Sequence, residues 1–411
     1  MKGLYLFIFL FSFLRNSAQA PKELPGDWRA MLQREDSVLV IFNLHSSTNN
    51  GKLELFITNA SEKIELSDIV LKGDSLNFNL PVFESSFKTR ILSDGSLQGI
   101  WIKGTAARIQ HWPFYAKAGV SERFPLKHGD AKFNLGGRWK LTLTRPNGTT
   151  RLAVAEFEQN QNKLTGTVIT PNGDYRFMEG IVTGDSMFLS VFDGAHAYYF
   201  RGRADEQEQL SGFYYAGING REAFIAVKDE TAGIAEGISS PKLRTSDDRL
   251  NFKFKDIDGN WVSINDARFK NKVVIVQLMG SWCPNCMDET AFLSDYYKKN
   301  KARGVEVVSL AYEYSTDFER SQKTLRKFQQ LHKVTYPMLI TGVGVSDSLR
   351  TEKTLPQITP IRAFPTSIFI GKDGRIKKIH TGFVGPGTGN RYEEYKKRFY
   401  AWVDELLAQE P

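Results

Sequence analysis

The alternation of apolar and polar residues divides the chain into two parts. Between residues 26 and 227, apolar residues alternate or cluster in short segments, such as 53–57 and 76–82, with turn signals such as Gly73-Asp74-Ser75 between them. This part of the sequence has no long stretch of helical period. The pattern predicts short strands in an antiparallel meander, closed into a small barrel or a sandwich.

This strand pattern occurs twice, each time with the same landmarks. Gly26-Asp27-Trp28 recurs as Gly137-Arg138-Trp139, and Gly73-Asp74-Ser75-Leu76 recurs as Gly184-Asp185-Ser186-Met187, each 111 residues later. A constant spacing over this length indicates a duplicated unit. We predict two tandem β-modules, at residues 21–126 and 127–230.

A segment of small and polar residues follows the modules, and the pattern then changes. Residues 231–250 are predicted to be a linker with few contacts. Beyond it, apolar runs at 272–279, 305–311 and 335–340 predict buried strands.

The segments between and after these strands have helical patterns or hairpin signals. Helices are predicted at 286–301, at 316–332, where Thr316 and Glu319 form a capping box, and at 392–407. Asp258-Gly259 and Asp373-Gly374 predict hairpins. Strands and helices in this order predict an α/β domain at residues 251–411, with a mixed sheet covered by helices on both faces.

The first 20 residues have the composition of a secretory signal peptide. Lys2 precedes an uncharged apolar run at residues 4–14, and Ala18-Gln19-Ala20 follows. The run is shorter than the ~20 residues of a membrane span. We therefore predict export to the periplasm or cell envelope of a bacterium. A buried first strand and an uncleaved anchor at the membrane surface are the alternatives.

Composition narrows the classes of function. With 41% hydrophobic and 24% charged residues, the 411-residue chain is typical of soluble globular domains. The formal charge is +8, but lysine and arginine are scattered among nearly as many acids. This distribution argues against nucleic-acid binding.

The chain has only two cysteines, Cys283 and Cys286, directly after a predicted strand and at a predicted helix start. A disulfide this short closes almost no loop and adds little stability, so the pair needs a chemical explanation. Free N–H groups in the first helical turn favour a thiolate at Cys283, Pro284 suits that turn, and Cys286 lies deeper. A zinc site would need further ligands, and the six histidines are dispersed. A purely structural disulfide is the other alternative.

These motifs together resemble a known family. Trp282-Cys283-Pro284-Asn285-Cys286, the acid Glu289, and Phe364-Pro365-Thr366 before a hairpin make residues 251–407 similar to the TlpA/ResA-like exported thiol–disulfide oxidoreductases of thioredoxin-like fold. The resemblance implies a redox-active Cys283–Cys286 disulfide and a cis Pro365 facing it. It also implies that Phe364 pairs with an extended substrate.

Gln277 departs from that family, in which Asp or Asn is common six residues before the first cysteine. An amide cannot accept the proton of Cys286, so Glu289 is the better candidate base. The alternative for Glu289 is a solvated acid on the helix surface. Because Asp288 and Glu289 oppose thiolate formation while Pro284 and Asn285 are uncharged, we predict a reducing site.

The leading hypothesis is an exported protein disulfide reductase. No glycine-rich dinucleotide loop is present, so we expect no cofactor, and we expect an upstream dithiol protein to supply the electrons. With no further ligands beside the two cysteines, we also expect no metal. An antioxidant thiol peroxidase of the same fold is an alternative, although Gly280 stands where a Thr-x-x-Cys site needs threonine. In a third hypothesis, the β-modules bind a glycan or an envelope protein, or hold the redox domain away from a membrane.

Overall fold

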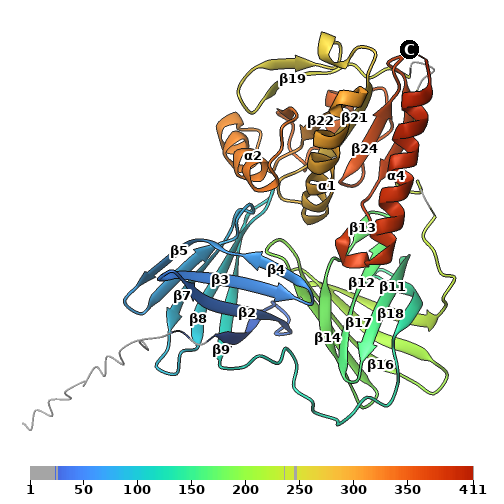
Figure 1. Ribbon diagram of the computed structural model, residues 1–411. Coiled ribbons are helices and arrows are strands. Elements are labelled where there is room, and N and C mark those ends of the chain that lie inside the picture. Colours follow the sequence, from blue (N-terminus) through green and yellow to red (C-terminus); the bar gives the residue numbers. More distant parts are fainter. Residues whose placement is uncertain (1–23, 25, 236, 245–247, 411) are drawn as a thin grey trace, which may run out of the picture.

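We describe the protein from a computed structural model, which covers residues 24, 26–235, 237–244 and 248–410. These residues form three sheets. The C-terminal domain lies above two β-modules that stand side by side (Figure 1). The predicted signal peptide at residues 1–20 lies outside the described residues. Within those residues, no helix is both long and apolar enough to span a bilayer.

The first β-module is an antiparallel sheet of nine strands in the order β4-β3-β2-β1-β9-β8-β7-β6-β5. Side chains alternate along its strands, so that Trp28, Ala30 and Leu32 of β1 point into a buried core. The strands are β1 Asp27–Gln33, β2 Leu39–Asn49, β3 Lys52–Asn59, β4 Glu62–Glu65, β5 Ser67–Lys72, β6 Ser75–Asn79, β7 Ser85–Ile91, β8 Leu97–Gly104 and β9 Ile109–Ala118.

The second β-module repeats this meander, and its sheet closes on itself. Strand β11 pairs with both β10 and β12, and β12 pairs with β14, so the sheet returns to its own start as a barrel. The strands are β10 Gly137–Thr144, β11 Thr150–Asn160, β12 Lys163–Thr170, β13 Gly173–Asp174, β14 Met178–Thr183, β15 Ser186–Phe192, β16 Ala197–Ala204, β17 Gln209–Ala216 and β18 Gly220–Lys228. The all-β prediction for this part of the chain is confirmed.

The two modules share a buried interface. Phe192 at the end of β15 packs against Phe42 of the first module, with ring centroids 4.4 Å apart. The buried guanidinium of Arg123, which follows the first sheet, donates to the carbonyl of Ser190 at 3.0 Å and to the side chain of Asn43 at 2.9 Å. These contacts join the modules through apolar packing and satisfied polar groups.

The C-terminal domain has a mixed seven-stranded sheet in the order β20-β19-β23-β22-β21-β24-β25. Strands β21, β22 and β23 are parallel, whereas β24 and β25 are antiparallel. Every residue of β21 is buried, as its continuous apolar run predicts. The strands are β19 Lys253–Asp256, β20 Trp261–Ser263, β21 Val273–Met279, β22 Val305–Ala311, β23 Met338–Ile340, β24 Thr366–Ile370 and β25 Ile376–Thr381.

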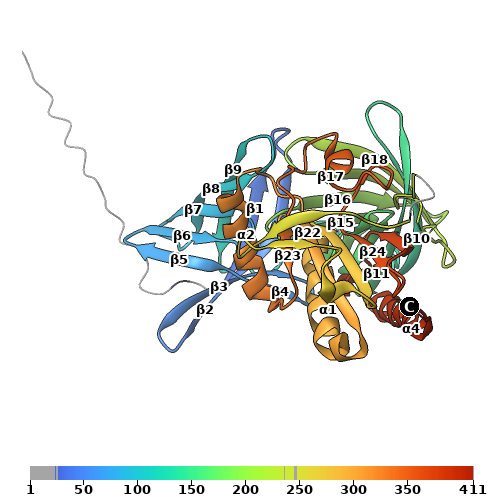
Figure 2. The same cartoon turned by 90° about the horizontal axis from the view of Figure 1, so that it is seen from above.

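Helices cover both faces of this sheet, as predicted. The long helices α1 Pro284–Asn300, α2 Phe318–His332 and α4 Asn390–Ala408 share one core with one face, and the short α3 Arg350–Thr354 lies over the other. Short 3₁₀ turns occur at Ala267–Phe269, Lys301–Arg303 and Pro386–Thr388. From above, α2 lies over the first module and α4 over the second (Figure 2).

Two local expectations are wrong. The cap of α2 is Asp317, whose carboxylate accepts from Arg320 N at 2.7 Å, so the capping box at Thr316 and Glu319 does not form. A carboxylate one residue later captures the free N–H groups first.

The predicted linker also has many contacts in its described part. Backbone bonds join Arg244 to Gln357, and Ser240 accepts from the backbone of Thr381. Small polar residues allow the segment to lie close along the C-terminal domain, where its backbone finds partners.

Candidate active site

Cys283 and Cys286 stand at the start of α1, directly after the buried strand β21. Cys283 is the residue before the first helical turn, and its Sγ accepts from the backbone N–H of Cys286 at 3.2 Å. The two sulfurs form a disulfide. Cys283 is 5% exposed, whereas Cys286 is fully buried. The two sulfurs therefore differ in access and in their place relative to the helix N-terminus.

The loop before β24 faces this pair. The Phe364–Pro365 peptide bond is cis, as the family resemblance implied. The carbonyl oxygen of Phe364 lies 3.7 Å from Cys283 Sγ. Trp282 packs edge-on against the Phe364 ring and donates its indole N–H to the carbonyl of Tyr312 at 2.8 Å. Residues that are far apart in the sequence, such as Trp282 and Phe364, thus lie around the Cys283 sulfur.

Glu289 lies behind the disulfide, one helical turn after Cys286. It is fully buried, so the alternative of a solvated surface acid is wrong. One carboxylate oxygen accepts from Gln277 Nε2 at 2.9 Å and the other from Ser367 Oγ at 2.9 Å. Burial raises the pKa of Glu289 to about 7, although both hydrogen bonds oppose the rise. A carboxyl group of this pKa exchanges protons readily near neutral pH.

Gln277 orients Glu289 through a buried polar network. Its amide nitrogen also donates to Thr290 at 3.0 Å, and its carbonyl oxygen accepts from Ser309 at 2.8 Å. With both ends of the amide engaged, its orientation is fixed. Gln277, which replaces the Asp or Asn common in the family, therefore places a fixed N–H donor beside Glu289.

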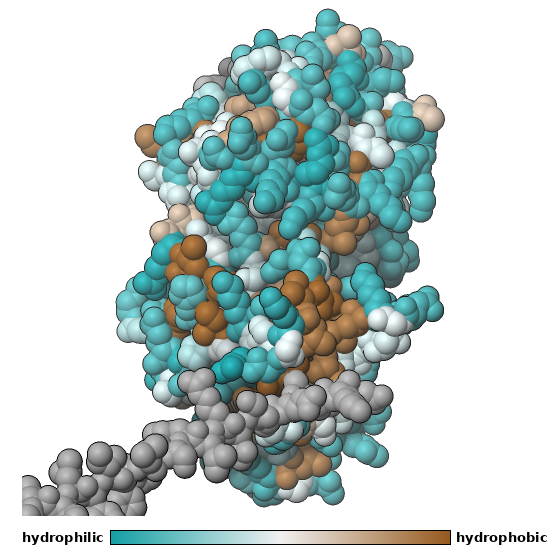
Figure 3. Space-filling view, turned by 90° about the vertical axis from the view of Figure 1, so that its left-hand side faces the viewer, coloured by the Kyte–Doolittle hydropathy of each residue, from teal (hydrophilic) through white to brown (hydrophobic). Residues whose placement is uncertain are grey.

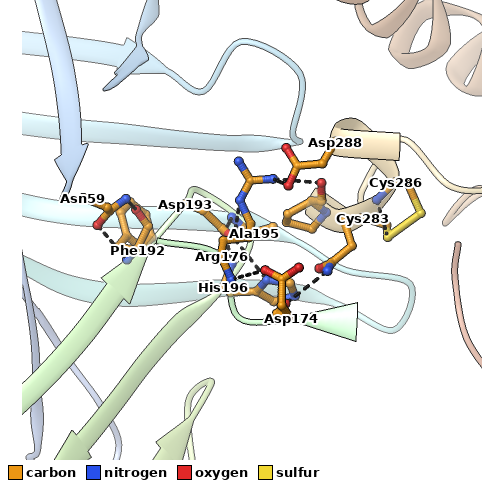
Figure 4. Close-up of polar contacts among 12 residues, drawn as sticks. Asn59, Asp174, Arg176, Phe192, Asp193, Ala195, His196, Cys283, Cys286 and Asp288 are labelled. Atoms are coloured by element: carbon orange, nitrogen blue, oxygen red, sulfur yellow. Dashed lines mark hydrogen bonds and ion pairs between the residues drawn. A yellow bond between two sulfur atoms is a disulfide. The ribbon is translucent and has the colours of Figure 1, made fainter. Parts of the chain in front are cut away.

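The second β-module reaches this site through its segment at residues 173–176 (Figure 4). Asn285, between the two cysteines, donates to the carbonyl of Asp174 at 3.1 Å, and the carboxylate of Asp174 accepts from Gly385 N at 2.7 Å. Arg176 donates to the carbonyl of Pro284 at 3.0 Å and to Asp288 at 2.5 Å. Pro284 and Asn285 are consequently buried beneath a neighbouring module.

The first β-module covers the other side of the same site. Val82, in the loop before β7, belongs to the buried core that contains both cysteines. Glu84 forms an ion pair with Arg320 of α2. Phe83 and Trp282 help to line a crevice of about 10 Å³, which has room for about one water molecule.

The structure brings together all the residues that the sequence singled out: Cys283, Cys286, Glu289, Pro365, Trp282, Pro284, Gln277 and Phe364. Sequence reasoning missed Asp174 and Arg176, which belong to no motif and precede Cys283 by about a hundred residues. It also missed that Asp288 is paired with Arg176. The only available signal was that the two repeats differ in charge at these positions.

Comparisons with known proteins agree with this geometry. A model of the AhpC/TSA family matches residues 246–379. The thiol-disulfide oxidoreductase ResA of Bacillus thuringiensis subsp. konkukian is 27% identical over 157 residues, which are 38% of this chain and 79% of that protein. The thioredoxin-like protein YneN of Bacillus subtilis is 25% identical over 166 residues, 40% of this chain and 83% of that protein.

Solved structures are also similar. A thiol:disulfide interchange protein of Chlorobium tepidum TLS has 19% identity and a TM-score of 0.29, and covers 43% of this chain and 100% of its own. A thiol-disulfide oxidoreductase from Bacteroides fragilis has 18% identity and a TM-score of 0.27, and covers 35% and 96%.

The family match and the ResA relatives confirm the resemblance stated for residues 251–407. The C-terminal domain is thioredoxin-like, and the enzyme class is that of the thiol–disulfide oxidoreductases.

Proposed function

We propose that this protein is an exported disulfide reductase that acts on protein disulfides through Cys283 and Cys286. One observation carries the proposal: the pair stands at the N-terminus of α1, with the first sulfur before the helix and the second buried within it. That arrangement provides one activated sulfur and one sheltered resolving sulfur.

The reaction is a two-step exchange. In the reduced protein, the Cys283 thiolate attacks a substrate disulfide, a mixed disulfide forms, and one substrate sulfur leaves as a thiolate. The thiolate of Cys286 then attacks Cys283 Sγ, the second substrate sulfur leaves, and the Cys283–Cys286 disulfide remains. Two electrons pass to the substrate, and an upstream dithiol protein returns them.

We propose that the carboxylate of Glu289 accepts the proton of the Cys286 thiol. Both lie on one face of α1 at a spacing of three residues, and the carboxyl has a pKa of about 7. In its ionised form it accepts the proton of the Cys286 thiol before the second step. Gln277 and Ser367 hold the carboxylate in place.

The direction of electron flow depends on how strongly the surroundings of Cys283 stabilise its thiolate relative to the disulfide. The Phe364 carbonyl oxygen beside Sγ accepts from a thiol and repels a thiolate, whereas the Cys286 N–H favours the thiolate. We expect a potential nearer ~−270 mV than the ~−120 mV of a strong oxidant. Export, through the segment at residues 1–20, places the reaction in the periplasm or cell envelope.

Equilibration of the full chain against glutathione buffers tests this proposal. The expected result is one two-electron transition that disappears in Cys283→Ala. A potential above about −180 mV, the value of an isomerase, would make the protein an oxidant and contradict the proposed direction.

A thiol peroxidase is the second candidate, because the family model that matches residues 246–379 is AhpC/TSA. Gly280, three residues before Cys283, lacks the hydroxyl that a Thr-x-x-Cys site uses. We therefore expect hydrogen peroxide to oxidise the reduced protein no faster than a free thiol of the same pKa. Rapid stoichiometric oxidation at Cys283 would favour the peroxidase instead.

A further inference from the structure

Arg176 lies where the two β-modules and the C-terminal domain meet. It is 7% exposed. Its Nη1 donates to the carbonyl of Pro284 and to the carboxylate of Asp288, both on α1 (Figure 4). Its Nη2 pairs with Glu62 of the first module. One side chain of the second module thus fixes the turn between the two cysteines.

Acids outnumber cations around this guanidinium. Glu62 comes from β4, Asp174 from β13, and Asp193 from the turn after β15. The His196 ring binds the same Asp193 oxygen, Oδ2, that faces Arg176. Asp288 comes from α1 itself. His332 at the end of α2 also faces the cluster, and burial and the charge of Arg176 lower its pKa to about 4, so it is neutral at pH 7.

Negative charge near the start of α1 bears directly on Cys283. A thiolate before a helix is favoured by the N–H groups of the first turn and disfavoured by nearby carboxylates. Asp288 lies one turn into that helix, and Arg176 is its cationic partner in the structure. The balance between thiol and thiolate at Cys283 therefore depends on Arg176, a residue of the second β-module.

Building on the proposed function, we propose that Arg176 is a positioning residue of the redox site. It holds the turn at Pro284 and Asn285 and offsets the charge of Asp288, and thereby favours the Cys283 thiolate. The second β-module is then part of the active site. This explains why the segment at residues 173–176 lies against the cysteine turn.

The duplication supplies an internal comparison. In the first module, the residues 111 positions earlier are Lys63 and Glu65, so both charges are reversed relative to Asp174 and Arg176. Lys63 and Glu65 are exposed on β4. Only the second copy carries the charges that suit the turn at Pro284 and Asn285, and only that copy places this segment against it.

The test measures how fast iodoacetamide labels Cys283 in the reduced full chain. Labelling is monitored by the mass of the peptide that contains Cys283, and the rate is measured at a series of pH values. R176Q removes the cation, so labelling at pH 7 should slow about tenfold, as for a rise of one pKa unit. D288N removes the acid on α1, while Arg176 keeps its pairs with Glu62 and Asp193, so labelling should speed up. R176Q/D288N removes both charges and should return the rate to within about threefold of the wild type.

Two further variants separate charge from structure. R176K keeps the cation and should retain most of the rate. R151Q is the matched control, because Arg151 is a partly buried arginine of the same module that bonds Glu222 and Tyr175 instead. Its rate should equal that of the wild type.

Several results would overturn the inference. They are an unchanged rate in R176Q, an equally slow rate in R176Q/D288N, or the same slowing in R151Q. If R176Q fails to unfold cooperatively, the test rests on D288N alone. In that case, labelling of D288N no faster than that of the wild type overturns the inference. Failure of the wild-type chain to exchange with glutathione would instead refute the proposed function itself.

Discussion

The two β-modules share a repeated sequence pattern but differ in strand pairing at the seam, where the third strand of each module lies beside the fifth. In the second module, β12 pairs with β14 and the barrel closes. In the first, β3 pairs with β4 and not with β5, and β4 leads directly into β5 through Leu66, whose backbone N–H donates to the carbonyl of Leu55. A groove of about 820 Å³ opens beside this seam. Hydrophobic side chains gather over the β-modules on this side of the molecule (Figure 3).

Two glycines of the second module accompany this difference. Gly166 and Gly180 lie in the strands that close the second barrel, and a Cβ atom would lie 2.0 Å from the carbonyl of Glu156 and 1.8 Å from that of Phe188. The first module has Leu55 and Ile69 at these positions. Glycine within a strand marks a tight bend or a close approach of another backbone, as at the corner of a barrel.

The modules also meet the C-terminal domain differently. The second contributes buried charges at Asp174 and Arg176, whereas the first contributes Val82 and the partly exposed Glu84. The two modules thus share a strand order, while a few positions distinguish the copy that contributes charges to the proposed site. A repeat predicts a shared fold and leaves the function of each copy to its individual residues.

Exchanging the charges between copies should produce the largest effect. D174K/R176E gives the second module the residues of the first and buries mismatched charges, so the free energy of unfolding should fall by about 3–5 kcal/mol. The reciprocal K63D/E65R changes exposed residues and should cost under about 1 kcal/mol. Urea unfolding of both variants checks this, and equal losses would show that the copies are equivalent.

The titration of Glu289 should be independent of both modules. Its pKa is raised to about 7 from 4.5, so the carboxyl is neutral in folded and unfolded chains below about pH 4.5. As the pH rises toward 7, only the unfolded chain ionises and stability is lost, by about 3 kcal/mol. E289Q should remove this loss between pH 5 and 8, while E319Q, at an exposed acid of α2, should not. Identical pH profiles for E289Q and the wild type would contradict the burial of this group.

A substitution at the seam of the second module should change stability by a smaller amount. G180I places the residue of the first module in the second and should destabilise it by about 1–3 kcal/mol through overpacking against the Phe188 carbonyl. I69G in the first module removes a side chain that packs partly against the core and should cost about 1–2 kcal/mol. If circular dichroism and urea unfolding give G180I the stability of the wild type, glycine is not what closes the barrel.

The smallest effect belongs to the contact of the first module with α2. Glu84 and Arg320 are partly exposed, so E84Q should lower stability by about 0.2–1 kcal/mol and less in high salt. The swap E84R/R320E should recover most of the loss. A loss above about 2 kcal/mol in E84Q would show that this ion pair is a major anchor.

The sequence was informative where chemistry is local. The order of strands and helices in the C-terminal domain and the cysteines at a helix start follow from apolar runs and a motif a few residues long. The environment of Glu289 required the fold, since Gln277 and Ser367 come from two different strands. The contact at Arg176 was beyond sequence reasoning, because charge pairing between modules has no fixed spacing.

The central claim is that Cys283 attacks and Cys286 resolves, and the chain's two cysteines make it directly testable. The measurement is the intact mass of C286A and C283A after each reduced variant meets a protein disulfide substrate. We expect a stable mixed disulfide on Cys283 in C286A and none in C283A. An adduct on Cys286 in C283A, with none in C286A, would reverse the two roles and contradict the mechanism.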